Sequence, residues 1–178
     1  MKEIDYWKQF YNKKITNKPS NFAVFCSNII DGSLIDLGCG NCRDTNYFKG
    51  LGILAVGIDN ANTEKDVIRV DISAYIKEME SPKYVYSRFL WHSINEELQD
   101  EILKWTADYI MIETRTDKDI PLDLFGKHRR NLTNVNELIK KLIDNKFEIL
   151  FLRQGTGLSK FKKEDPHTLW LIARKSQS

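Results

Sequence analysis

A glycine-rich turn between an apolar strand and a helix constrains this chain more than any other feature of its sequence. Gly38-Cys39-Gly40 follows the apolar run 34–37 and precedes a predicted helix over 43–48. Glycine has no side chain, so the backbone of such a turn can approach a ligand closely. The helix that follows directs free N–H groups toward the same place. The sequence therefore predicts a ligand site at the end of a first strand.

Strands and helices alternate along the rest of the chain. Strands are expected at 34–37, 53–58, 67–70, 84–87, 109–112, 147–152 and 168–173. Helices are expected at 4–11, from Ser20 or Asn21 to about 30, and at 43–48, 72–79, 94–105 and 135–145. This alternation predicts an α/β fold with a doubly wound, mostly parallel sheet. No helix separates the last two strands, so the C-terminal strand should be antiparallel.

Length and charge limit the classes of protein to which the chain can belong. Its 178 residues fit a single domain, 1–178, in which 1–32 form an N-terminal helical cap or lid. The formal net charge of +2 argues against a dedicated nucleic-acid binder. No apolar run reaches the roughly 18 residues that a membrane span needs, and the N-terminus lacks a signal-peptide core. A cytoplasmic protein is expected, and the oligomeric state stays open.

The three cysteines, Cys26, Cys39 and Cys42, leave two interpretations open. Cys39 and Cys42 form one C-x-x-C pair, a spacing typical of redox motifs. The glycine turn gives a better reason for Cys39, and small buried thiols in a reducing cytoplasm are the simpler interpretation. No second pair of zinc spacing follows, so no metal site is expected.

Two kinds of cofactor fit a glycine turn of this type. A dinucleotide fingerprint needs a third glycine, where this chain has Arg43, and an acid about 20 positions on, where Asp59 fits either cofactor. Asp36 discriminates, because an acid just before the first glycine would repel a pyrophosphate. The same acid suits the cationic amino acid end of S-adenosylmethionine. A P-loop is excluded, since no Gly-Lys-Ser/Thr follows.

The segment 34–41 resembles motif I of class I S-adenosylmethionine-dependent methyltransferases. The segment 56–59 resembles motif II, whose acid binds the ribose hydroxyls, and 70–72 resembles motif III, whose acid faces the adenine amine. The family often has glycine where this chain has Cys42, and we expect that residue 42 need not have a positive φ. The resemblance implies a Rossmann-like methyltransferase sheet, S-adenosylmethionine as cofactor and S-adenosylhomocysteine as product. The expected cofactor-binding residues are Tyr11, Asp36, Gly38, Cys39, Gly40, Arg43, Asp59, Asn60, Asp71, Ile72 and Ser87.

A narrower resemblance covers several separated segments. The segments 6–11, 19–23, 86–94, 113–119, 128–130 and 164–166 are similar to those of small bacterial methyltransferases from capsule and surface-polysaccharide gene clusters. Some members of that subgroup methylate phosphate-type groups, including phosphoramidates, on the polysaccharide. This resemblance implies a small acceptor, namely a phosphate- or phosphoramidate-type or sugar-linked precursor of bacterial capsular polysaccharide, and a nucleotide-linked acceptor is also compatible with it.

Basic residues after the fourth and fifth strands predict the acceptor side. Arg88 and His92 are four apart, so a helical turn would put them on one face. Arg115 and Arg129 could clamp a phosphate. A hydroxyl acceptor would instead need a general base, for which His92 is the first choice and His128 the second. The sequence thus predicts an O-methyltransferase; an RNA or protein methyltransferase and a non-catalytic nucleotide-binding module are the alternatives.

Overall fold

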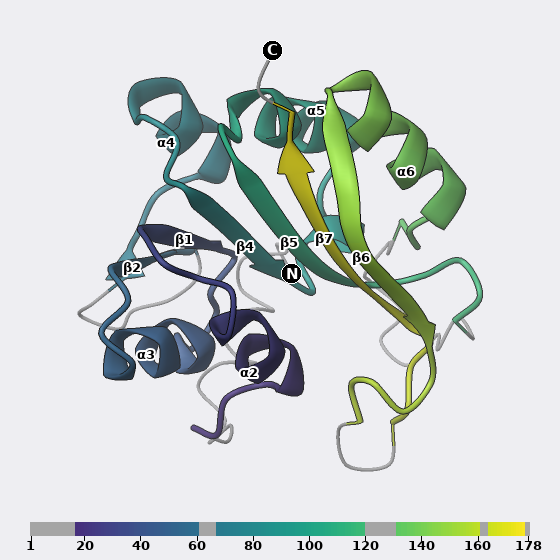
Figure 1. Cartoon of the computed structure of the whole chain (residues 1–178), viewed down its shortest axis with the longest axis horizontal. Coiled ribbons are helices and arrows are strands. Elements are labelled where there is room, and N and C mark those ends of the chain that lie inside the picture. The colour runs from purple at the N-terminus through teal and green to yellow at the C-terminus, as the bar shows by residue number, and fades with distance from the viewer. Residues whose placement is uncertain (1–16, 61–66, 120–130, 161–163, 177–178) are drawn as a thin grey trace, which may run out of the picture.

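The computed structural model describes residues 17–60, 67–119, 131–160 and 164–176, and these contain one seven-stranded sheet (Figure 1). Its strands are β1 (Leu34–Leu37), β2 (Ala55–Ile58), β3 (Val67–Ile68), β4 (Tyr84–Arg88), β5 (Tyr109–Arg115), β6 (Phe147–Gly155) and β7 (Thr168–Lys175). The strand order is β3-β2-β1-β4-β5-β7-β6. Only β7 runs against its neighbours, pairing antiparallel with both β5 and β6. The expected doubly wound sheet with one antiparallel C-terminal strand is confirmed.

Helices cover both faces of the sheet (Figure 1). They are α2 (Asn21–Ser27), α3 (Arg43–Gly50), α4 (Ile72–Glu78), the short 3-10 helix η1 (Trp91–Ser93), α5 (Glu96–Trp105) and α6 (Val135–Asp144). Ser20 caps α2 and Asn134 caps α6, as their sequence positions predict, because short polar side chains can accept the free N–H groups of a first turn. Within the described ranges, no helix is long and apolar enough to cross a membrane.

Several predicted elements are shorter than expected, among them β3, which ends at Ile68 rather than at residue 70, and α2, which ends at Ser27 rather than near residue 30. The strand predicted from residue 53 begins at Ala55, because β1 has only four residues and its ladder with β2 starts at the pair Leu34–Ala55. The helix predicted from residue 94 begins at Glu96, where Asn95 accepts the N–H of Leu98. The predicted helix over 4–11 lies outside the described residues, and with it most of the expected lid.

The core has two layers, one on each face of the sheet. Helices α4, α5 and α6 pack on one layer, which includes Leu37, Val85 and Ile112. Helices α2 and α3 pack on the other, which includes Tyr86 and Met111. Because side chains alternate along a strand, the next residues on this second face at the carboxyl ends of β4 and β5 are charged rather than apolar. The second face therefore changes from an apolar core to a polar site at that edge.

Candidate active site

The glycine turn lies at the switch point of the sheet, where β1 has β2 on one side and β4 on the other. In such sheets ligands bind at the carboxyl ends of the strands beside this point. The N–H groups of Gly38 and Cys39 donate to the carbonyl of Ile58 at 2.8 and 3.2 Å, which holds the turn against β2. Gly38 has φ +70°, and a Cβ there would lie 3.0 Å from the Leu90 side chain. The turn therefore requires glycine for both conformation and space.

Cys42 corrects one expectation. Its φ is +57°, in the left-handed region, so the expectation that residue 42 need not have a positive φ is wrong. The chain reverses there to enter α3, and Cys42 is the N-cap residue without a side-chain capping bond. A left-handed conformation costs a non-glycine residue about 1 kcal/mol. The glycine that the methyltransferase family often has at this place suits the same backbone.

Asp59 contacts the glycine turn, as its position directly after β2 predicts. Its Oδ2 accepts the N–H of Gly40 at 3.0 Å, and the residue is only 8% exposed. Asn60 follows it directly and is exposed. The acid that the sequence assigns to the ribose thus lies against the second glycine of the motif. That acid also helps to shape the turn.

Asp36 is a buried carboxyl group with a strongly perturbed acidity. Thr45 donates its hydroxyl to Asp36 Oδ2 at 2.6 Å. Burial raises the pKa of Asp36 to about 7, and the negative charges of Asp44 and Asp59 act in the same direction. The Thr45 bond and the Arg88 charge lower this pKa only in part. Asp36 is therefore partly protonated near neutral pH and would be favoured as an anion by a cation placed beside it.

Ser87 and Asp71 differ in whether their side chains already have hydrogen-bond partners. Ser87 lies one residue before the end of β4, beside Leu37 of β1, and its Oγ is buried without a hydrogen-bond partner. Such a group normally has a partner, so Ser87 fits a ligand contact. The exposed Asp71 accepts the N–H of Ser73 at 2.9 Å and caps α4, while Ile72 packs into the core. The adenine roles of Asp71 and Ile72 stay predictions.

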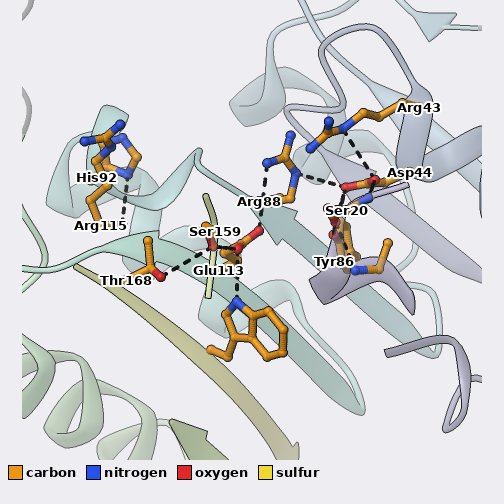
Figure 2. A network of polar contacts seen from close by, with 12 residues as sticks. Ser20, Arg43, Asp44, Tyr86, Arg88, His92, Glu113, Arg115, Ser159 and Thr168 are labelled. Atoms are coloured by element: carbon orange, nitrogen blue, oxygen red, sulfur yellow. Dashed lines mark hydrogen bonds and ion pairs between the residues drawn. The ribbon is translucent and has the colours of Figure 1, made fainter. Parts of the chain in front are cut away.

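Asp44 is the centre of a buried polar network that sequence reasoning missed (Figure 2). Its carboxylate accepts the backbone N–H of Ser20 at 2.7 Å, the Ser20 hydroxyl at 2.8 Å and the Tyr86 hydroxyl at 3.0 Å. Arg88 Nε lies 2.9 Å from Asp44 Oδ2, and Arg43 Nε lies 3.6 Å from Oδ1. The network ties the start of α2 to α3 and β4. An acid in the first turn of a helix is so common that the sequence offered no signal for this role.

Glu113 continues the network on β5 (Figure 2). Its Oε1 accepts the indole N–H of Trp170 at 2.9 Å and the hydroxyl of Ser159, and Arg88 Nη1 lies 3.9 Å from Oε2. Burial raises the pKa of Glu113, while the charge of Arg88 and the bonds from Ser159 and Trp170 oppose the shift. A signal was present, because Glu113 ends a predicted strand just as Asp59 and Asp71 do.

The acceptor residues do not share the helical face expected for them. Arg88 is the last residue of β4, Phe89 has φ +56° and His92 lies in η1, so no helical turn joins Arg88 to His92. His92 is 4% exposed, and its Nδ1 lies 3.1 Å from Thr114 Oγ1. A 3-10 turn entered through a left-handed residue separates the two side chains.

Arg115 is held by two carboxylates. Its Nη1 and Nη2 lie 2.9 Å from Asp119 and from Glu164, respectively. Figure 2 shows Arg115 beside His92, whereas Arg88 lies between Asp44 and Glu113. The roles of Arg88, His92 and Arg115 toward an acceptor stay predictions. The other expected site residues, Tyr11, His128 and Arg129, lie outside the described residues.

Comparison with solved structures finds the same fold. TehB from Haemophilus influenzae is 23% identical with a TM-score of 0.68, covering 98% of this chain and 68% of that one. A SAM-dependent methyltransferase from Archaeoglobus fulgidus is 15% identical with a TM-score of 0.65, covering 97% and 95%. Magnesium protoporphyrin IX methyltransferase (ChlM) from Synechocystis, with bound SAH, is 13% identical with a TM-score of 0.65, covering 97% and 83%. No protein-family model matches the chain, and no curated protein sequence matches it.

Proposed function

We propose that this chain, which has the fold of class I S-adenosylmethionine-dependent methyltransferases, transfers a methyl group from S-adenosylmethionine to a small acceptor. The observation that carries the proposal is the excess of buried acid around the glycine turn. Four carboxyl groups lie there with two guanidinium groups, namely Asp36, Asp44, Asp59 and Glu113 with Arg43 and Arg88. S-adenosylmethionine carries a sulfonium and an ammonium group against one carboxylate, so it is a net cation of matching sign.

The residues around the turn fit the parts of this cofactor. Asp59 would accept the ribose hydroxyls and Asp71 the adenine amine, as the motifs imply. Asp36 and Ser87 would bind the methionine end, where one offers a carboxylate and the other an unsatisfied hydroxyl. A phosphate-bearing dinucleotide fits poorly, because Asp36 would repel its pyrophosphate. When bound, S-adenosylmethionine supplies an electrophilic methyl group that an acceptor takes by in-line displacement.

We further propose a hydroxyl group as the acceptor rather than a phosphate-type anion. Both arginines of the described acceptor side, Arg88 and Arg115, already face carboxylates. They are therefore less suited to clamp a phosphate, and a neutral acceptor group is favoured. A hydroxyl must lose its proton during transfer, and His92 beside Arg115 is the proposed base. A sugar-linked precursor of a surface polysaccharide is the proposed source of that hydroxyl, and it rests on the narrower sequence resemblance.

The acidity of Asp36 gives the proposal a direct test. The cation should bind best when Asp36 is ionised, so binding below the pKa of about 7 has to release a proton. Affinity for S-adenosylmethionine should therefore rise about tenfold between about pH 6 and pH 8, and then level off. Calorimetric titration at several pH values measures this change.

Two variants separate Asp36 from other titrating groups. Asp36→Asn should bind S-adenosylmethionine weakly, and its affinity should depend less on pH. The pH dependence that remains in this variant measures the titration of the ligand's own amino group. Thr45→Val removes the hydrogen bond that lowers the pKa of Asp36, so the rise in affinity should move to higher pH. An affinity of the native protein that does not change over this range would contradict the role of Asp36.

A further inference from the structure

The glycine turn also brings two cysteine thiols together. A hydrogen bond joins the sulfur atoms of Cys39 and Cys42, which lie 3.2 Å apart. The N–H of Cys42 donates to the carbonyl of Cys39 at 3.0 Å, which closes residues 39–42 into a β-turn. A β-turn keeps its end Cα atoms within about 7 Å, and a disulfide needs roughly 4.4–6.8 Å. The backbone of the turn therefore has the reach for a bridge.

Gly57 of β2 lies directly beneath both sulfur atoms. A Cβ at this position would lie 2.8 Å from Cys39 Sγ and 3.0 Å from Cys42 Sγ. Only the flat backbone of glycine leaves room for the two thiols side by side on this strand. The two side chains are thus packed toward the same point, which favours contact between them over separate rotamers.

The two thiols are also unequal as nucleophiles. The hydrogen bond with Cys39 lowers the pKa of Cys42, and the same bond together with burial raises the pKa of Cys39. The pair therefore loses its first proton mainly from Cys42. A thiolate is the form of cysteine that exchanges with disulfides. Cys39 is partly exposed and Cys42 is buried, so an external disulfide can reach the pair from the Cys39 side.

We propose that Cys39 and Cys42 form a reversible disulfide by exchange with a low-molecular-weight disulfide, and that this bridge weakens cofactor binding at the turn. In the first step a thiolate of the pair attacks the external disulfide and releases one external thiol. The second thiol of the pair then displaces the other external thiol and loses its proton. Two electrons pass from the pair to the external disulfide, which is reduced to two thiols.

The bridge should weaken cofactor binding because it changes the positions of residues 39 and 42 in the turn. This step rests on the proposed function. Bridging shortens the separation of the sulfur atoms from 3.2 Å to about 2.05 Å. The sulfur atoms already fill the space beside β2 that a side chain at residue 57 would take. Closing the bridge therefore draws residues 39 and 42 together, and Gly40 between them donates its N–H to Asp59. Cys42 is also the N-cap of α3, which carries Thr45 to Asp36.

The test uses the full chain with Cys26→Ala, which removes the third thiol, a buried group in α2. The protein is equilibrated with glutathione disulfide, and mass spectrometry of the peptide that contains residues 39 and 42 reports the bridge. We expect this peptide to lose two hydrogens and to regain them with dithiothreitol. Titration with S-adenosylhomocysteine should show about fivefold weaker binding by the bridged protein.

Cys42→Gly in the same background is the matched control. Glycine suits the left-handed backbone at this position, so the variant should fold and bind S-adenosylhomocysteine equally well with and without oxidant. Failure of the parent to lose two hydrogens, or stable glutathione adducts alone, would overturn the bridge. A bridge that leaves the affinity unchanged would overturn its effect on the cofactor. If the parent forms the bridge but its reduced form never binds S-adenosylhomocysteine, the proposed function fails and the bridge stands.

Discussion

Replacing Asp59 by alanine is expected to weaken the binding of S-adenosylhomocysteine by about 100-fold. A charge-assisted hydrogen bond contributes about 1.5–3 kcal/mol, and the proposed carboxylate would accept bonds from two ribose hydroxyls. The upper end of that range corresponds to about two orders of magnitude in the dissociation constant. The variant also loses the bond from the Gly40 N–H at 3.0 Å, which helps to hold the turn. Calorimetric titration of the two proteins measures the difference.

Asp31→Asn is the matched control for Asp59→Ala. Asp31 is an exposed acid that pairs with Lys83 just before β4, at the opposite edge of the sheet from the turn. Its replacement should leave the affinity for S-adenosylhomocysteine within about twofold of the parent, because exposed ion pairs contribute little. If Asp59→Ala binds as tightly as the parent while remaining folded, motif II does not have the role that the resemblance implies.

Asp44→Ala is expected to lower the free energy of unfolding by about 3–5 kcal/mol. Removing one partner of a buried ion pair leaves the other charge uncompensated, and losses of this size are typical. The Ser20 N–H and the Tyr86 hydroxyl would lose their acceptor at the same time. The total free energy of unfolding of a domain is about 5–15 kcal/mol. The loss should therefore lower the urea concentration of half-unfolding markedly, which circular dichroism measures.

Arg88→Met tests whether the charge pair causes that loss. If the Asp44–Arg88 contact at 2.9 Å dominates, the double variant should be more stable than the sum of the two single losses predicts. Asp31→Ala removes an exposed ion pair of similar length and should lower the free energy of unfolding far less, because exposed ion pairs contribute little. Equal losses for Asp44→Ala and Asp31→Ala would contradict a central role for the buried network.

The features predicted correctly from sequence are those that depend on local pattern. The turn Gly38-Cys39-Gly40, the strand before it and the acid that follows β2 could all be identified, because strand ends and glycine turns have strong local signals. The helix starts before α2 and α6 could be placed for the same reason, because a short polar side chain, Ser20 or Asn134, stands at each of them.

The features that were missed depend on contacts between distant segments. In the sequence, Asp44 is an ordinary acid in the first turn of a helix. It becomes the centre of the polar network only when α2, α3 and β4 pack together. The expected face with Arg88 and His92 assumed helical spacing, which the left-handed Phe89 breaks. The left-handed conformation at Cys42 was missed as well, because cysteine has no preference for it; the glycine that the resembling family often has at this position was the available signal.

The pairing of Arg115 illustrates why the acceptor side is harder to predict than the cofactor side. Its two carboxylate partners, Asp119 and Glu164, are 45 residues apart in sequence. Glu164 lies in the segment just before β7. The sequence suggested that Arg115 could clamp a phosphate. The fold neutralises that arginine, and this is why we favour a hydroxyl acceptor.

Binding of S-adenosylmethionine by the unmodified chain tests the central claim most directly. Isothermal titration at about pH 8, where Asp36 is ionised, should show saturable binding of S-adenosylmethionine and S-adenosylhomocysteine at a stoichiometry near one, in the micromolar range or tighter. NADH and NADPH should produce no saturable heat under the same conditions. Binding of a dinucleotide in place of S-adenosylmethionine, or no binding of either by the folded protein, would contradict the account.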